Sequence, residues 1–260
     1  MGILNTTPDS FSDGGRFITE EAIIRQIDAM IDDGADIIDV GGESTRPFAD
    51  PVSLDEELRR TIPAIKAIRQ RYQLPISIDT TKSEVARQAL LAGADIINDI
   101  SALRFDPQMI SVAVGSACPV IIMHMQGSPK DMQVQPDYDN VVKNVSAFFR
   151  ERIAWAAQRG LDRQKIILDP GIGFGKTVTH NLSLLKNLQA LTLLGCPLLV
   201  GHSRKSFIGK ILQLDADNRD VATAALSAVC VMNGVALLRV HDVKKTVQAV
   251  RLAEAVLAAP

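Results

Sequence analysis

Cysteine is scarce in this sequence. Only three of the 260 residues are cysteine, and no two of them have the CxxC spacing of a metal or redox site. Cys118, Cys196 and Cys230 stand among apolar or small neighbours, so we expect free buried thiols in a reducing compartment, by default the cytoplasm. The sequence therefore predicts neither a disulfide scaffold nor a cysteine-bound metal.

Long apolar runs and an excess of charge of one sign are also missing. No stretch approaches the ~18 consecutive apolar residues of a membrane span, and no basic segment leads an apolar run at the N-terminus. The formal net charge is -2, which argues against the basic face that nucleic-acid binding normally needs. We therefore expect neither a membrane nor a nucleic acid as a partner.

The pattern of the chain predicts one domain over residues 1–260, because no linker or low-complexity stretch divides it. Short apolar runs alternate with longer stretches of helical period, as in βα units around a parallel sheet. The length is close to the roughly 250 residues of one α/β barrel. We therefore predict a single (β/α)₈ TIM barrel, whose eight strands are Gly2–Asn5, Ile37–Val40, Ile76–Asp79, Ile96–Asp99, Val120–Met123, Ile166–Asp169, Leu198–Gly201 and Leu237–Val240.

Two further features support this division of the chain. Gly34, Gly93 and Gly234 each stand just before a predicted strand, as helix C-caps do, and residues 219–233 predict an extra helix before the last strand. The chain starts inside an apolar run, which predicts that a segment before Met1 is missing.

A polar residue ends each predicted strand or follows it directly. Such residues often only cap the next helix, but in a barrel these strand ends converge on the face where enzymes of this fold place their sites. The coincidence of eight polar groups therefore predicts a site at this face, drawn from Asn5, Asp39, Asp79, Asn98, His124, Asp169, Ser203 and Arg239.

Two glycine-containing loops follow the first two strands. TTPDSFSDGGRF carries Phe11 and Asp13, and its two glycines favour a lid that closes over a ligand rather than a plain surface turn. GGESTRPF carries Arg46, which gains interest because its loop follows a barrel strand beside the first loop.

Asp79, Asn98 and Asp169 form the central constellation. Carboxylates accept parallel N–H bonds and an amide both donates and accepts, so this trio suits a flat heterocycle with an amidine-like edge. Acid–base catalysis by two carboxylates or a metal site is the alternative, although no third carboxylate or histidine is spaced to complete a metal cluster.

The run DPGIGFGKT resembles nucleotide-binding loops but fails both patterns. Pro170 occupies the first glycine position of a phosphate loop, and Lys176 stands where the dinucleotide motif has glycine or alanine. SRKS and RVHD follow the last two strands, where this fold often holds phosphate. Ser203, Lys205, Arg239 and His241 are therefore candidates for binding an anion, whereas Arg204 should face away and His180 and His202 are taken as structural.

Taken together, these segments resemble the dihydropteroate synthase family, folate-pathway enzymes that sulfonamides target. The resemblance spans nearly the whole chain and rests on MGILNTTPDSFSDGG, GGESTRP, SIDT, NDI, MHMQGSP, DPGIGFGK, SRKS and RVHD in that order. The first loop and SRKS are specific to the family, while the other segments recur in related pterin-binding barrels. Family members generally carry a short segment before the first strand, which this chain lacks.

The resemblance implies a role for each candidate residue. The pterin would be held by Asp79, Asn98, Met123, Asp169, Phe174 and Lys205, the diphosphate by Asn5, Arg239 and His241, with Asn5 also meeting Mg²⁺, and p-aminobenzoate by Phe11, Thr45, Arg46, Pro47 and Ser206. The implied catalytic residues are Lys205, Asp79, Asp169 and Asp13. It also implies a homodimer joined through the last helices. A pterin-dependent methyltransferase barrel and a non-catalytic pterin-binding barrel are the rival interpretations.

Overall fold

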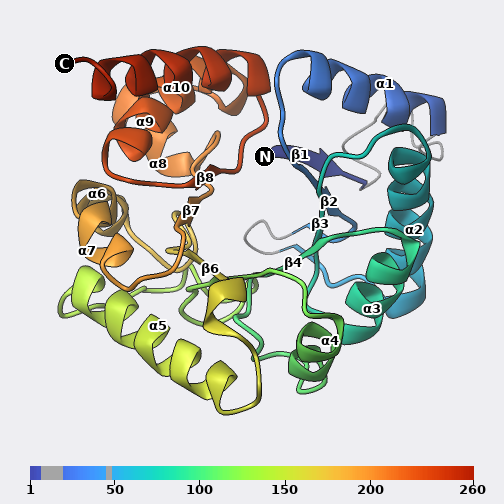
Figure 1. Ribbon diagram of the computed structural model, residues 1–260. Helices are drawn as coiled ribbons and strands as arrows, with labels where there is room; N and C mark the ends of the chain where they lie inside the picture. The colour runs from blue at the N-terminus through green and yellow to red at the C-terminus, as the bar shows by residue number, and fades with distance from the viewer. Residues whose placement is uncertain (7–19, 45–48) are drawn as a thin grey trace.

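The structure is a computed structural model and describes residues 1–6, 20–44 and 49–260. Eight short parallel strands form a ring at its centre (Figure 1). Their bounds are β1 Gly2–Asn5, β2 Ile38–Gly41, β3 Ile76–Asp79, β4 Ile96–Asp99, β5 Val120–Met123, β6 Ile166–Asp169, β7 Leu199–Val200 and β8 Leu237–Leu238.

The strands close into a barrel. β1 to β6 pair in sequential order in one parallel sheet, and β7 pairs with β8 in a second. Two bridges join the sheets, Leu168 with Leu198 at one seam and Gly2 with Val240 at the other. The predicted (β/α)₈ barrel is therefore confirmed. β7 and β8 are shorter than predicted: only Leu199–Val200 and Leu237–Leu238 pair with each other, while Leu198 and Val240 form single bridges to β6 and β1.

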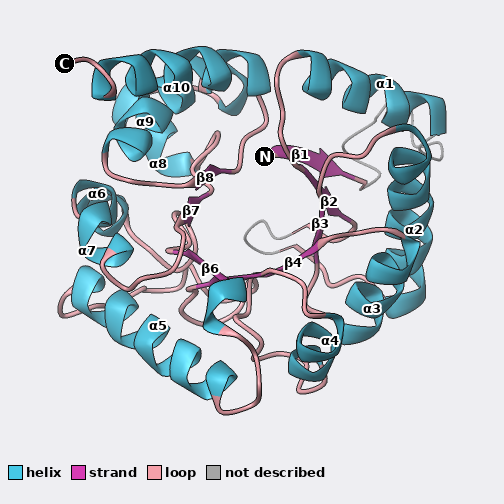
Figure 2. Ribbon diagram, in the orientation of Figure 1, coloured by secondary structure: helices cyan, strands magenta, loops and turns pink. Residues whose placement is uncertain are grey.

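Helices surround the ring on its outer side (Figure 2). They are α1 Glu20–Asp32, α2 Leu54–Arg71, α3 Ser83–Ala92, α4 Met109–Ser116, α5 Val141–Ala157, α6 Val178–Lys186, α7 Leu188–Thr192, α8 Ser206–Leu212, α9 Asp220–Met232 and α10 Val243–Leu257, with 3₁₀ turns η2 Arg163–Lys165 and η3 Ala216–Asn218. The predicted extra helix between the last two strands is confirmed as α9. Within the described residues, no helix has the length and apolar character needed to cross a membrane.

Local sequence signals explain where these helices begin and end. The Ser53 side chain accepts a hydrogen bond from the backbone N–H of Glu56 at the start of α2, and Asp242 caps α10 through Lys245 N–H in the same way. The three predicted C-cap glycines all have a positive φ, between +82° and +113°, which favours residues without a side chain.

Two apolar layers hold the barrel together. The larger lies between the strands and the helices, and it buries Ile38, Val40 and Ile78 completely. A smaller layer lies inside the ring, on the strand faces that point away from the helices, and it includes Ile121 and Leu199. Because side chains alternate along a strand, residues two positions further on, such as Met123, also point inward but nearer the carboxyl ends.

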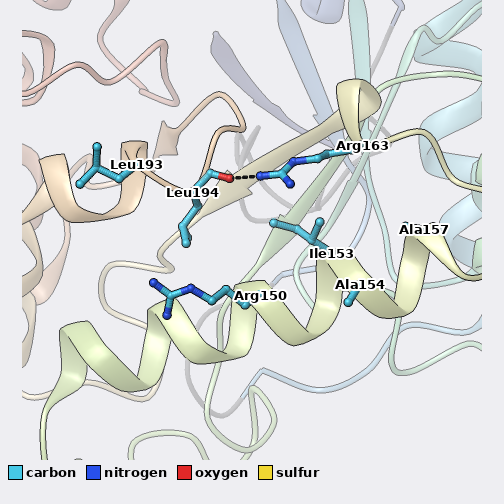
Figure 3. A pocket seen from close by; sticks show the side chains of 7 residues that line it. All are labelled: Arg150, Ile153, Ala154, Ala157, Arg163, Leu193 and Leu194. Atoms are coloured by element: carbon cyan, nitrogen blue, oxygen red, sulfur yellow. Dashed lines mark hydrogen bonds between the residues drawn. The ribbon is translucent and has the colours of Figure 1, made fainter.

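One cavity lies away from these carboxyl ends. It has a volume of about 460 Å³ and lies between α5 and α7 (Figure 3), lined by Arg150, Ile153, Ala154, Ala157, Arg163, Leu193 and Leu194. Arg163 and Leu194 precede β6 and β7, which places this cavity toward the amino ends of the strands. Its described lining includes no carboxylate or side-chain amide, so it lacks the groups expected of the predicted site.

Candidate active site

Strand register brings the predicted polar groups into one layer. Asn5 pairs with Gly41, Gly41 with Asp79, and Asp79 with Asn98, so all four lie at the same height and face the same side of the sheet. Asp79 and Asn98 are buried, and Asn5 is half-buried. Glycine at position 41 leaves space in this layer, since a side chain there would begin 3.8 Å from both the Asn5 and the Asp79 oxygens.

Arg239 crosses the barrel interior from the end of β8 and pairs with two carboxylates. Its Nε donates to Oδ2 of Asp39 at 2.6 Å, and its Nη2 donates to Oδ2 of Asp79 at 2.7 Å. The side chain of Arg239 is only 19% exposed. The Asn98 amide nitrogen also lies 3.4 Å from both oxygens of Asp39. Four strands are therefore tied together by one polar network.

Burial and charge set the protonation of this network. Burial raises the pKa of Asp79 to about 7, with Arg239 opposing the rise and Asp39 adding to it. Burial also raises the pKa of Asp169, although the N–H of Gly171 and the nearby cations Lys205 and Arg239 oppose it. For Arg239, burial works against the charge, but the two carboxylates outweigh it and raise its pKa above the ordinary value.

The loop after β6 forms one wall of the pocket. Gly171 has φ +66°, and a side chain there would lie 2.0 Å from the carbonyl oxygen of His124, so only glycine fits. Phe174 is buried and packs with Met123 in a small apolar cluster. The Lys205 ammonium lies 4.0 Å from the centre of the Phe174 ring, which places this cation beside the wall.

The loops after β7 and β8 meet at the same end of the barrel. The Ser203 hydroxyl accepts a hydrogen bond from the backbone N–H of His241 and lies 2.9 Å from Nδ1 of its ring. Ser206 is exposed and begins α8 directly after Lys205. Lys205, Arg239 and His241, which the sequence predicts to bind an anion, therefore come from neighbouring segments that close one side of the candidate site.

A cavity of about 290 Å³ opens beside Asp79 among the loops after β2 to β5. Ile100 and Phe105 give it apolar surface, while Lys82 and Lys130 contribute cations. Its lining therefore extends the polar layer toward the mouth of the barrel.

Comparison with known proteins identifies the family. A family model described as "Pterin binding enzyme" matches residues 1–241. The chain is 52% identical over 256 residues to the dihydropteroate synthase of Synechocystis sp., covering 98% of this chain and 89% of that one. The chain belongs to the dihydropteroate synthase family.

Solved structures of the family share the fold described above. The dihydropteroate synthase of Yersinia pestis in complex with a sulfonamide drug superposes with a TM-score of 0.95 at 43% identity, over 99% of this chain and 94% of that one. That of Xanthomonas albilineans with 7,8-dihydropteroate gives a TM-score of 0.90 at 42% identity, over 100% and 93% of the two chains. These comparisons give no support to the methyltransferase interpretation.

Five candidate residues of the family site lie outside the described residues. They are Phe11 and Asp13 in the first loop and Thr45, Arg46 and Pro47 in the second. Three residues taken as lying outside the site have other partners: Arg204 pairs with Asp220, His202 lies 3.0 Å from the Thr223 carbonyl oxygen and the Ser227 hydroxyl, and His180 caps α6.

Two residues of the synthase site network were not assigned a role from the sequence. Asp39 was noted only as a polar strand end, yet it is fully buried against Arg239. Lys176 was noted only as the residue that breaks a nucleotide motif, yet it is buried as well. A charged residue inside an apolar strand or after a run of glycines is the signal that could have identified both.

Lys176 holds the loop after β6 in place by donating hydrogen bonds to its backbone. Its Nζ lies 2.9–3.2 Å from the carbonyl oxygens of His124, Gly171 and Phe174, and 3.0 Å from Nδ1 of His124. Burial, reinforced by the Lys176 charge, lowers the pKa of His124 to about 2, so the imidazole is neutral and accepts from the lysine. Burial lowers the pKa of Lys176 itself to about 7.

Replacing Lys176 by methionine should lower the free energy of unfolding by about 2–4 kcal/mol, because buried carbonyl oxygens would lose their donor. Urea denaturation at pH 6, where the lysine is charged, would measure the change. Lys186→Met on the exposed face of α6 is the matched control and should cost less than about 0.5 kcal/mol. If the two variants unfold at the same urea concentration, Lys176 does not brace this loop.

Proposed function

We propose that this synthase condenses 6-hydroxymethyl-7,8-dihydropterin diphosphate with p-aminobenzoate to give 7,8-dihydropteroate and diphosphate. One observation carries the assignment within the family: acceptor groups lie deep in the barrel, one cation pairs with them there and a second lies beside the pocket wall. Asp79, Asn98 and Asp169 supply the acceptors, and Lys205 and Arg239 the cations. This arrangement matches a substrate with a donor-rich ring at one end and a diphosphate at the other.

The pterin ring would lie in the pocket with its N–H edge toward the three acceptors. Met123 and Phe174 would contact its faces, because both belong to the apolar cluster beside Asp169 and Asn98. The Lys205 ammonium, which lies over the Phe174 ring, would contact the edge of the heterocycle nearer the mouth.

The reaction is a substitution at the pterin CH₂ group. The amine nitrogen of p-aminobenzoate forms a bond to this carbon while the bond between carbon and the diphosphate oxygen breaks, and the electron pair leaves with the diphosphate. The new nitrogen centre then loses a proton to solvent. Because the arylamine is neutral at pH 7, no side-chain nucleophile or base is required. Positive charge that develops on the pterin is stabilised by Asp79 and Asp169, which is the basis of their proposed catalytic role.

The leaving diphosphate needs fixed positive charge. Lys205, Arg239 and His241 would supply it, and the Ser203 hydroxyl holds the His241 backbone and ring in place. Arg239 uses Nε and one terminal nitrogen on Asp39 and Asp79, which leaves its other terminal nitrogen for a phosphate oxygen.

Asn5 fits a weak Mg²⁺ site. Its side-chain oxygen and that of Asp79 flank the space above Gly41, and oxygen atoms are the ligands that Mg²⁺ prefers. No group of three acidic, histidine or cysteine ligands occurs within the described ranges, so substrate phosphate and water would complete the coordination. When bound, the ion would neutralise charge on the diphosphate.

The p-aminobenzoate would lie above the pterin, near Ser206 at the start of α8. Phe11, Thr45, Arg46 and Pro47 complete this proposed subsite, and Asp13 is proposed as a catalytic residue of the first loop. These five assignments rest on the sequence motifs alone, whereas Ser206 is exposed next to Lys205.

A diphosphate-release assay would test the function. The purified protein is mixed with 6-hydroxymethyl-7,8-dihydropterin diphosphate, with and without p-aminobenzoate and with and without Mg²⁺. We expect diphosphate and 7,8-dihydropteroate in equal amounts only when all three are present. Tight pterin binding without any dihydropteroate would instead indicate a non-catalytic pterin-binding barrel. Activity that is unchanged by a chelator would contradict the Mg²⁺ assignment alone.

The last helices are the proposed homodimer interface. α9 and α10 lie side by side (Figure 1), and Val221, Val229, Leu252 and Val256 expose between 45% and 72% of their surface there. Sedimentation equilibrium should report a dimer, and Leu252→Glu should shift it to monomer. Leu91→Glu on α3, at a position 77% exposed, is the control and should leave the dimer intact. A monomeric parent protein would refute this interface.

A further inference from the structure

Asp39 is a fully buried carboxylate that lies two residues before Gly41 on β2, and so below the polar layer of Asn5, Asp79 and Asn98. It is the second residue of β2, paired in register with Ile3 and Ser77, while Gly41 two positions later belongs to the layer of Asn5 and Asp79. Asp39 therefore supports the pocket from beneath.

The contacts of Asp39 all come from donors of the pocket. Arg239 donates from Nε at 2.6 Å, and the Asn98 amide nitrogen approaches both carboxylate oxygens at 3.4 Å. In the ion pair with Arg239 the carboxylate oxygens of Asp39 serve as hydrogen-bond acceptors. Asp39 thus holds a cation and an amide at the same time.

An ionised carboxylate accepts hydrogen bonds and donates none, which decides how Asn98 is oriented. The two ends of an asparagine amide are nearly the same size but opposite in hydrogen-bonding character. Only Nδ2 can face Asp39 favourably, so Oδ1 turns the other way. Among the described residues no donor reaches that Oδ1. The amide oxygen is therefore available to a ligand as an acceptor.

With Asn98 in this orientation, Asp79, Asn98 and Asp169 all present oxygen acceptors to the pocket. The 2-amino group and ring N–H of a pterin are donors that match such an edge. A heterocycle with a carbonyl oxygen in place of the amino group would bring oxygen against oxygen in a buried site, which such sites reject strongly.

We propose that Asp39 is a positioning residue that fixes the orientation of the Asn98 amide and so makes the pocket selective for a donor-rich heterocycle edge. This inference rests on the proposed pterin site and adds the residue that sets its selectivity. Asp39 acts through Asn98 and need not touch the substrate.

Asp39→Asn tests the inference, because an amide at position 39 can either donate or accept and no longer dictates how Asn98 is turned. Calorimetry would give the dissociation constants of 6-hydroxymethylpterin and of 6-hydroxymethyllumazine, in which a carbonyl oxygen replaces the 2-amino group. We expect the parent protein to bind the pterin much more tightly than the lumazine. In Asp39→Asn, the dissociation constant of the lumazine divided by that of the pterin should be about tenfold smaller than in the parent. A loss of stability alone would weaken both ligands equally and leave the ratio unchanged.

Glu57→Gln is the matched control, since Glu57 is also fully buried but pairs with Lys82 outside the polar layer. It should leave the ratio as in the parent. If Asp39→Asn does not fold, the double variant Asp39→Asn/Arg239→Gln removes the pair with no net charge change, and its ratio is compared with that of Arg239→Gln. An unchanged ratio in either comparison overturns the role of Asp39, whereas a parent protein that binds neither ligand overturns the proposed function instead.

Discussion

Lys205→Ala should lower kcat at least a hundredfold, on the order of 3 kcal/mol of transition-state stabilisation. The Lys205 ammonium lies beside Phe174 and near the Asp169 carboxylate, where the proposed pterin pocket would meet the proposed diphosphate-binding residues. Its charge acts most strongly when the bond to the diphosphate is breaking. Steady-state diphosphate release would show a fall in kcat that is matched by the fall in kcat/KM.

The neighbouring helix offers a control for this substitution. Lys210 lies on the exposed side of α8, and Lys210→Ala removes the same charge from the same element without touching the pocket. It should keep kcat within about twofold, since surface changes of this kind cost about 0.5 kcal/mol or less. A Lys205→Ala enzyme as active as Lys210→Ala would remove Lys205 from the catalytic residues.

Arg239→Met should destabilise the fold as well as abolish diphosphate binding. Asp39 and Asp79 are both buried, and Arg239 is the cation paired with each of them. Removing one member of a buried ionic network typically costs about 3–5 kcal/mol, because the remaining charge is left without a partner. Urea denaturation at pH 7 would measure this loss, alongside calorimetric binding of diphosphate.

The loss should depend on pH in a defined direction. The pKa of Asp79 is about 7 in the folded protein, against 3.8 for an unperturbed aspartate, and the charge of Arg239 opposes any further rise. Without the arginine the folded-state pKa rises further, so the native state binds more protons than the unfolded state between pH 4 and at least pH 7. Stability then falls as pH rises through this window. The parent loses stability through the same window only up to about pH 7, where its own Asp79 ionises, so the two proteins diverge above that pH. The deficit of Arg239→Met should therefore be smaller at pH 5 than at pH 9.

An exposed arginine provides the comparison for this experiment. Arg87 pairs with Glu84 on the surface of α3, and such pairs contribute little to stability. Arg87→Met should unfold within about 0.5 kcal/mol of the parent at both pH values. A deficit of Arg239→Met that does not change between pH 5 and pH 9 would mean that the ionisation of Asp79 does not control it.

The sequence predicted the barrel and the convergence of its polar strand ends because both depend on patterns along the chain. The carboxyl ends of parallel barrel strands converge on one face, so the strand pattern alone predicts that Asp79, Asn98 and Asp169 lie together. The shorter β7 and β8 were harder to predict, since their limits depend on which neighbour Leu198 and Val240 bridge to.

The partners of buried charges could not be predicted from the pattern. Nothing in the spacing of RVHD indicates that Arg239 turns inward to a residue 200 positions earlier, and this turn is what gives Asp39 its importance. The partners of Lys176 could not be predicted for a similar reason. Its acceptors are backbone carbonyl oxygens, which every residue carries, so no sequence motif identifies them. The roles of the five candidate residues in the first two loops stay predictions.

Arg239 also has a structural role at the seam between the two sheets. β7 and β8 share two residue pairs, and one bridge on each side joins them to the rest of the barrel. The side chain of Arg239 ties the end of β8 to β2 and β3 across the interior, as a cross-link that the backbone does not supply. Part of the free energy that closes the barrel thus comes from ion pairs inside the proposed substrate pocket. Evolution cannot exchange this residue to alter catalysis without also loosening the architecture that encloses the reaction.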